Sequence, residues 1–297
     1  MKKIVSIIMI GILVLSMIGC KAGSTSTVDS NVDASNISNQ EMKITHIGDA
    51  ILKNPVRELS ENIYSDTGIM KTDQYGQYTK EMIVYGITFI ADENIPDEYM
   101  LKIAKTTKQI FAVDENTNKQ LQENVLQNMY RYKALVPVVY SEETMIDPSE
   151  FMVSSSICDI IMYESNVRAM EVVEHILHTA TDIGLHYADI DNFGITETSK
   201  LYNIMQKHIE AGDYNVSNYK DLSESIKNRV LLQEFIYWGI TSEWDIQKQF
   251  GTGENEWAYQ SSKLMKENAP EFDKLFHETI STIITSPDID MLNLLLK

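Results

Sequence analysis

The sequence has only 2 cysteines, Cys20 and Cys158, in 297 residues. If Cys20 is modified, as argued below, Cys158 has no partner left within the chain, so an internal disulfide is excluded. A protein outside the cytoplasm would then depend on its hydrophobic core for stability. Cys158 stands among Ile157, Ile160 and Ile161. This apolar setting favours a buried, unreactive thiol over a nucleophile.

Positive charge is also scarce. Lys and Arg number 25 against 43 Asp and Glu, which gives a formal net charge of −18. Such a surface repels nucleic acids and anionic lipids, so we expect no nucleic-acid partner. The sequence also lacks a glycine-rich phosphate loop and a Gly-x-Ser-x-Gly motif, which leaves no sign of a nucleotide site or of a serine hydrolase.

One long hydrophobic run is present, and it lies at the N-terminus. Lys2 and Lys3 precede a nearly unbroken apolar run from Ile4 to Ile18, and Gly19-Cys20 ends it. This pattern predicts a secretory signal peptide over residues 1–19. The Gly-Cys junction resembles the bacterial lipoprotein signal, which implies a lipid on Cys20. We therefore expect a protein anchored to the cell membrane through this lipid, on its extracytoplasmic face. In the alternative, the signal is cleaved elsewhere and Cys20 has no role.

The remaining chain divides into a spacer and one domain. Residues 20–44 comprise Cys20 and a segment rich in Ser, Thr, Asn and Asp, which is typical of a flexible linker. Residues 45–297 are long enough for one large domain, with no internal repeat. We expect an N-terminal α/β part over 45–165 and a helical part over 166–297.

Local sequence patterns predict a mixture of strands and helices in the first half of the chain and mostly helices in the second half. Pro55 should break the first helix, and Pro137 suggests that its strand lies at a sheet edge. Strands are expected at 82–90, 134–140 and 157–163, and residues 65–80 are rich in turn residues. Helices are expected at 45–64, 96–111, 119–133, 166–187, 198–211, 223–239, 256–267 and 270–286. This order indicates an α+β fold, with a small mixed sheet and helices in the N-terminal half and a mainly helical C-terminal half.

The helix expected at 166–187 has an unusual polar face. An ordinary solvated face mixes in Lys, Arg, Gln and Ser, but no Lys or Arg occurs between Arg168 and Lys200. The polar positions are instead Glu171, Glu174, His175, His178, Asp182 and His186. Almost all of these side chains bind metals or transfer protons, so the composition points to a metal site.

Helical spacing brings several of these side chains together. His175 and His178 are three residues apart, whereas Glu174 and His178 are four apart, and both spacings lie on one helix face. One helix supplies only one side of a metal site, so a further ligand must come from elsewhere. Glu234 is the best candidate, because this lone acid in an apolar helical run would be costly to bury without a partner.

From this pattern the chain resembles the zincin metallopeptidases, and among them the branch whose third zinc ligand is a Glu on a later helix. The resemblance covers roughly residues 80–240 and implies a zincin-like fold, bound zinc and a peptide or protein substrate. Zincins carry His-Glu-x-x-His, whereas this chain has Glu174-His175-x-x-His178. The order of the first two residues is therefore reversed.

Because of this reversal, the chain can be matched to the zincin motif in two ways, which we call registers. In one, Glu174 and His178 are ligands and His175 occupies the position of the base. In the other, His175 and His178 are ligands and Glu174 is the catalytic base. The second register assigns zinc to His175, His178 and Glu234, with Glu171 and Asp182 supporting the ligands.

Two broader alternatives stay open. The acids and histidines could simply pair along the helix, which would stabilise it by a few tenths of a kcal/mol per pair. At the level of function, the protein is either a zinc-dependent peptidase or an inactive relative, or else a non-enzymatic surface lipoprotein that binds a peptide, a solute or an envelope partner.

Overall fold

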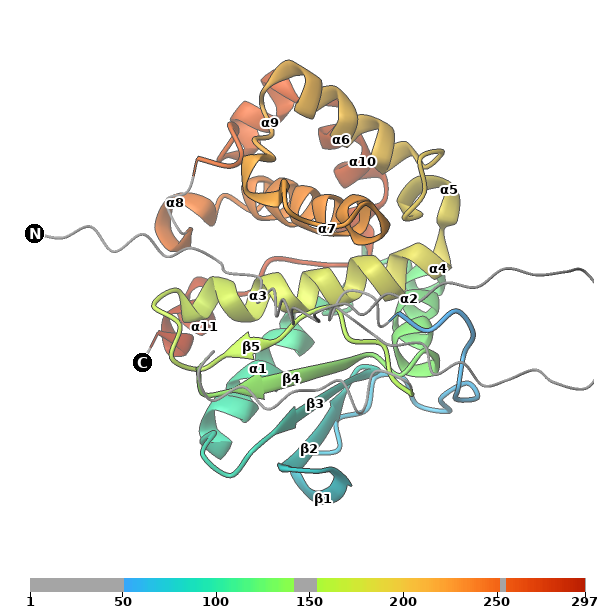
Figure 1. The fold of residues 1–297 in the computed structure, drawn as a ribbon, viewed down its shortest axis with the longest axis vertical. Helices are drawn as coiled ribbons and strands as arrows, with labels where there is room; N and C mark the ends of the chain where they lie inside the picture. Colours follow the sequence, from blue (N-terminus) through green and yellow to red (C-terminus); the bar gives the residue numbers. More distant parts are fainter. Residues whose placement is uncertain (1–50, 142–153, 252–254, 297) are drawn as a thin grey trace, which may run out of the picture. The chain divides into compact units, whose positions relative to one another are not determined.

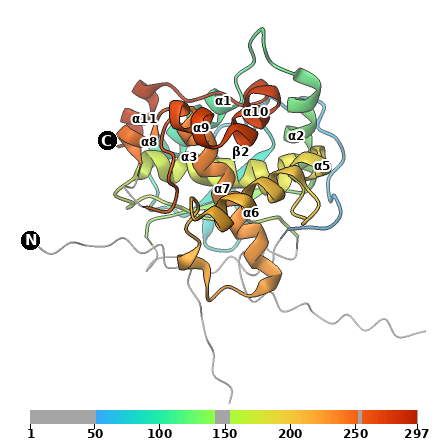
Figure 2. The same ribbon diagram turned by 90° about the horizontal axis from the view of Figure 1, so that it is seen from above.

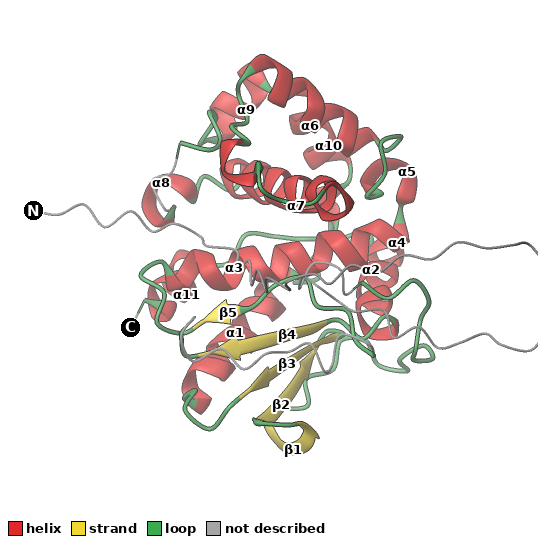
Figure 3. Cartoon of the chain, in the orientation of Figure 1, coloured by secondary structure: helices red, strands yellow, loops and turns green. Residues whose placement is uncertain are grey.

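The computed structural model describes residues 51–141, 154–251 and 255–296. The signal peptide, Cys20 and the linker predicted over residues 1–44 lie outside these ranges. Residues 47–297 form one compact unit. The α+β class is confirmed, because a small mixed sheet occupies the N-terminal half and mostly helices follow it (Figure 3).

The sheet has five strands in the order β1-β2-β3-β4-β5. Strands β1, β2 and β3 are antiparallel neighbours, whereas β3, β4 and β5 run parallel to one another. The strands are β1 (Met70–Tyr75), β2 (Tyr78–Val84), β3 (Ile87–Ala91), β4 (Leu135–Val139) and β5 (Ile161–Met162). Every residue of β3 and β4 is buried, which explains their continuous apolar sequences.

Two predictions for the first strands are wrong. The strand expected at 82–90 is a hairpin, because Tyr85 and Gly86 adopt positive φ angles of 50° and 86° and reverse the chain between β2 and β3. Glycine is needed at position 86, since a Cβ atom there would lie 2.5 Å from the carbonyl oxygen of Leu126. The turn-rich segment 65–80 in fact contains β1 and the start of β2.

Two further expectations fail. Residues 51–64 of the first expected helix form no helix in the described chain. Pro137 lies in β4, which has β3 on one side and β5 on the other, so it is not on an edge strand. The position tolerates proline because β5 pairs only with Val138 and Val139 and does not reach Pro137.

The helices that cover the sheet match their predictions. Helix α1 (Asp97–Ile110) follows Pro96 and has two acids in its first turn, and α2 (Lys119–Arg131) is capped by the Asn118 side chain, which accepts a hydrogen bond from the Leu121 amide. Both helices pack against the strands.

The helix with the unusual polar face lies between the sheet and the C-terminal helices. It consists of α3 (Arg168–Thr179), a π-helical segment (Ala180–Leu185) and α4 (His186–Ala188). Helix α7 (Glu224–Glu243) packs against α3 on the side away from the sheet (Figure 1). The expected helices at 166–187 and 223–239 are therefore present, and α7 extends to Glu243.

Of the remaining helices, α6 (Lys200–Ala211), α9 (Ser262–Asn268) and α10 (Pro270–Glu278) pack against α7, whereas α11 (Ile289–Leu295) packs against α1 and α3 (Figure 2). Helix α6 ends as expected at Gly212, whose φ is 82°. The helices expected at 256–267 and 270–286 are both shorter than predicted. The elements are α5 (Ile190–Phe193), α6 (Lys200–Ala211), α8 (Gln247–Phe250), α9 (Ser262–Asn268), α10 (Pro270–Glu278), α11 (Ile289–Leu295) and two 3₁₀ turns, Ser217–Tyr219 and Ile280–Thr282. Among the described helices, none has the length and apolar character needed to span a bilayer.

Candidate metal centre

The polar face of α3 points into the protein. Glu171, Glu174, His175 and His178 are all buried, and so is Asp182 in the π-helical segment. His178 and Asp182 have no exposed surface at all. Buried acids and imidazoles must find partners within the protein, because water does not reach them.

Helix α7 supplies the partner on one side of His178. Its Nε2 atom lies 3.6 Å from Oε1 of Glu234. Glu174, His178 and Glu234 each offer one ligand atom within 4.8 Å of the others. The structure thus brings Glu234 and His178 together across 56 positions of sequence, as the argument about a lone buried acid anticipates.

The other nitrogen of His178 is occupied. Its Nδ1 atom lies 3.1 Å from Oδ2 of Asp159 and 3.3 Å from Nε2 of Gln233. Gln233 accepts a hydrogen bond from Arg229 at Oε1, 2.8 Å away, so its amide nitrogen faces His178. Nδ1 cannot donate to Asp159 and accept from Gln233 at once, and the shorter contact to a carboxylate is the stronger one. Neutral His178 therefore donates its Nδ1 proton to Asp159 and turns Nε2 toward the two glutamates.

His175 belongs to a different set of side chains. Its Nε2 atom lies 3.3 Å from Oδ2 of Asp159, and its Nδ1 atom lies 3.6 Å from Oε1 of Glu171. Asp159, His175 and His178 form a second set of possible ligands, with Asp159 where the second register expects Glu234. Glu174, the ligand of the first register, thus lies on the Nε2 side of the His178 ring, and His175, the ligand of the second register, lies on its Nδ1 side.

The remaining sequence candidates support the centre. Glu171 accepts a hydrogen bond from the Met162 amide at 2.9 Å and so joins α3 to β5. Asp182 lies 2.5 Å from NH1 of Arg229, which in turn holds Gln233. Neither acid contacts the Glu174–His178–Glu234 set through a hydrogen bond that the structure shows.

Three residues of this network were absent from the sequence candidates. Asp159 precedes β5, and Arg229 and Gln233 lie on α7. Asp159 did carry a signal, since it is a lone acid among apolar residues, like Glu234. Arg229 and Gln233 stand one turn apart beside Glu234, but their types are common on exposed helices and gave no signal.

Burial and like charge make the Glu174–His178–Glu234 set electrostatically unusual. Burial and the nearby Glu234 carboxylate raise the pKa of Glu174 to about 8. Although burial alone would lower it, the pKa of His178 rises well above its ordinary value because of Glu234 and Asp159. Both shifts favour positive charge, whether protons or a metal ion, between these carboxylates.

The donor set fits a divalent metal. Among the described residues, Nε2 of His178 is buried and has no hydrogen-bond partner. Two ligand atoms at about 2.0–2.1 Å from a tetrahedral zinc lie roughly 3.3 Å apart, so the 3.6 Å separation of His178 and Glu234 is close to a ligand pair and too long for a hydrogen bond. One imidazole and two carboxylates form a set that zinc accepts.

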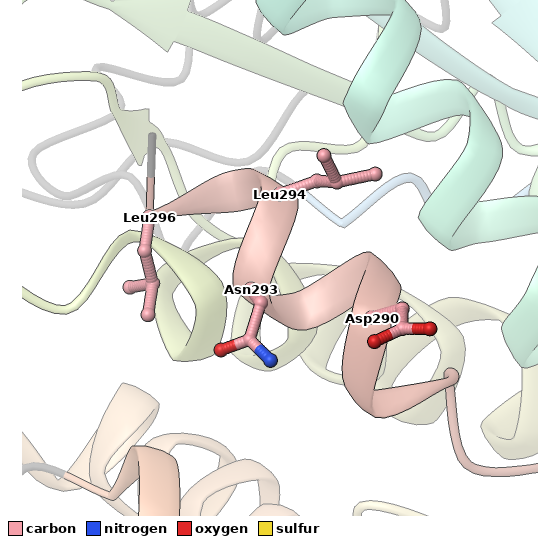
Figure 4. Close-up of a pocket in the computed structure, with 4 residues that line it drawn as sticks. All are labelled: Asp290, Asn293, Leu294 and Leu296. Atoms are coloured by element: carbon pink, nitrogen blue, oxygen red, sulfur yellow. The ribbon is translucent and has the colours of Figure 1, made fainter.

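A surface hollow lies away from this set. It is lined by Asp290, Asn293, Leu294 and Leu296, at and just beyond α11 (Figure 4). None of these residues belongs to either set built on His178. Comparisons with protein families, with curated proteins and with solved structures found no match for this chain.

Proposed function

We propose that this protein is a lipoprotein, anchored on the extracytoplasmic face of the cell membrane through Cys20, that binds zinc through Glu174, His178 and Glu234. The observation that carries the proposal is the His178 ring. Its Nε2 atom is buried beside two carboxylates without a hydrogen bond, while Asp159 occupies Nδ1. A metal ion would satisfy all three ligand atoms.

The surrounding residues would prepare the ligands. Asp159 accepts the Nδ1 proton of His178 and thereby holds the tautomer that leaves Nε2 free to bind. Arg229 orients Gln233, which lies against the same ring. Three protein ligands leave a fourth position open, and zinc in such a site lowers the pKa of a bound water toward neutrality.

This chemistry supports hydrolysis of a peptide or protein as the activity, in a zincin-like enzyme. In the first register Glu174 is a ligand, as in the proposed centre, whereas in the second register it is the general base. Because His175 contacts Asp159 and Glu171, it is turned toward the support of the centre and not toward Glu234. The departure from His-Glu-x-x-His favours a second candidate, in which the centre is retained in an inactive relative or in a lipoprotein that binds a peptide, a solute or an envelope partner.

Metal content tests the centre directly. After gel filtration, the protein lacking residues 1–20 should retain about one zinc per chain more than its His178→Ala variant, measured by elemental analysis. Asp159→Asn should weaken the binding of this zinc by roughly 10- to 100-fold because the ligand tautomer is no longer held. Glu267→Gln is the matched control, since this exposed carboxylate on α9 lies outside the centre.

Glu174→Gln separates the two roles of Glu174. If Glu174 is a ligand, the variant should bind zinc at least tenfold more weakly. If it is the base, the variant should keep zinc and lose cleavage of a peptide library that the parent protein cleaves. A folded parent protein that takes up no zinc at His178, with the same metal content as His178→Ala, would overturn the proposal.

A further inference from the structure

A third set of possible ligands lies at the C-terminal end of α7. It comprises Glu243, the last residue of α7, and Asp273 and His277 on α10, each of which offers one ligand atom within 4.8 Å of the others. Nε2 of His277 lies 3.6 Å from Oδ1 of Asp273 and 4.0 Å from Oε2 of Glu243. None of these residues belongs to the centre on α3.

Tight packing between two helices positions these side chains. Gly239 faces Phe272 so closely that a Cβ atom at position 239 would overlap the Phe272 ring. Glu243 is one turn beyond Gly239, and Asp273 follows Phe272, so the close approach of α7 and α10 brings both carboxylates to one place. His277 is one turn beyond Asp273 on α10 and shares its face.

The Glu243 carboxylate lacks a satisfactory partner. Its side chain is only 1% exposed, yet Oε1 has no hydrogen-bond partner in the part of the chain that the structure describes. The imidazole of His277 lies 4.0 Å from Oε2, which is too far for a hydrogen bond. Burial, together with Asp273 and Asp245, raises the pKa of Glu243 to about 7. The carboxyl group is therefore buried next to other acids, where a bound cation would stabilise its charged form.

We infer that Glu243, Asp273 and His277 form a second site for a divalent transition metal, zinc being the best match to one imidazole and two carboxylates. The His277 side chain is 62% exposed, so the ion can enter from solvent. A bound ion would join the end of α7 to α10. An ion pair between Asp273 and His277, four residues apart on one helix, would explain those two side chains but would leave the Glu243 oxygen without a partner.

Calorimetric titration of metal-free protein with zinc chloride tests this site. The experiment starts from His178→Ala, which removes the centre on α3, and Glu234→Gln serves as a second background if His178→Ala does not fold. Each background should bind one zinc. Adding His277→Ala or Asp273→Asn should weaken that binding at least tenfold, whereas adding Glu278→Gln should not, because this exposed acid of α10 lies outside the set.

Cobalt absorption gives an independent reading of the ligands. In the same backgrounds, the visible spectrum of bound Co²⁺ should change when His277 is replaced by Ala and stay unchanged with Glu278→Gln. Zinc binding that is equal in the His277→Ala and Glu278→Gln proteins, or absent from both folded backgrounds, would overturn the inference. The centre on α3 is tested separately, by comparing the zinc content of the unmodified chain with that of the His178→Ala and Glu234→Gln backgrounds.

Discussion

The two ring nitrogens of His178 have opposite environments. Asp159 lies next to Nδ1 and favours a proton on it, whereas Nε2 faces Glu174 and Glu234. Because Asp159 keeps a pKa well below its ordinary value through His175 and His178, in spite of burial, it remains a charged acceptor. A single carboxylate outside α3 therefore holds the proton on Nδ1 of His178.

His186 provides a test of protonation away from the metal centre. Its Nδ1 atom accepts a hydrogen bond from the Ile195 amide at 3.0 Å, and burial lowers its pKa below the ordinary value. Protonation would turn this acceptor into a donor. The folded state thus binds this proton less readily than the unfolded state, so the stability from His186 is complete above about pH 6.5 and is lost as the pH falls below that value.

We expect the free energy of unfolding to fall more steeply between pH 7 and pH 5 in the parent protein than in His186→Asn. Asn can place an oxygen near the Nδ1 position and cannot titrate in this range. The difference should be less than about 1 kcal/mol, because the side chain is partly exposed and solvent screens the charge. Urea denaturation at several pH values measures it, and parallel curves for the two proteins would contradict the role of His186.

At the residue level, composition and spacing predicted the acids and histidines of α3 and the lone buried Glu234. They did not reveal Asp159, since its partners His175 and His178 lie 3.3 and 3.1 Å away in space but 16 and 19 positions away in sequence. Spacing rules apply within one helix, whereas the pairing of Asp159 with His175 and His178 depends on how β5 packs against α3. The two registers differ in the role of His175, whose side chain reaches Asp159 through this same packing.

At the level of elements, the helix that begins with α3 continues through an irregular, π-helical segment (Ala180–Leu185). The hydroxyls of Thr179 and Thr181 donate to the carbonyls of His175 and Leu177, each at 2.8 Å. Such bonds compete with regular helical hydrogen bonding and distort helices. The chain passes into the π-helical segment at this point, where Gly184 packs against α2.

Gly184 should not tolerate a side chain. A Cβ atom there would lie 2.7 Å from Cγ1 of Val125 on α2. Alanine has the higher helix propensity by about 1 kcal/mol, but overpacking at a buried contact costs roughly 1–3 kcal/mol. We expect Gly184→Ala to lower the free energy of unfolding by about 1 kcal/mol, the difference between these two effects, measured by urea denaturation.

Val125→Ala supplies the control for this contact. The single change should also destabilise, since Val125 is buried. In the double variant the new methyl group at position 184 can occupy the space left at position 125, so the loss should be smaller than the sum of the two single losses. Additive losses, or a Gly184→Ala protein as stable as the parent, would show that packing between positions 184 and 125 does not exclude a side chain at position 184.

The order of elements was predictable and their boundaries were less so. The strand at 82–90 appeared continuous because Tyr85 is common in strands, and only the positive φ angles at Tyr85 and Gly86 reveal the hairpin. Pro137 suggested an edge, yet β5 is short enough to leave it unpaired beside a neighbouring strand. Such outcomes depend on tertiary pairing, which local propensity does not contain.

At the scale of the whole molecule, we expect the negative net charge and the lipid anchor together to determine how the protein associates with the membrane. The chain has a formal net charge of −18, and removal of Lys2 and Lys3 with the signal peptide would make it more acidic. An acidic domain is repelled by anionic lipid, so protein surface alone would not hold it at a membrane. Membrane association should therefore depend on the lipid at Cys20 and on the linker up to residue 44.

The two cysteines allow a matched test of this dependence. In a bacterial host the parent protein should partition into the detergent phase of a Triton X-114 extract, and its mass should show loss of residues 1–19 and gain of acyl chains. Cys20→Ser should shift at least tenfold toward the aqueous phase or keep its signal peptide, because no thiol remains to carry the lipid. Cys158→Ser should partition as the parent does, since Cys158 is buried and burial raises the pKa of its thiol well above the ordinary value. Equal partitioning of the Cys20→Ser and parent proteins would show that another feature of the chain holds it at the membrane.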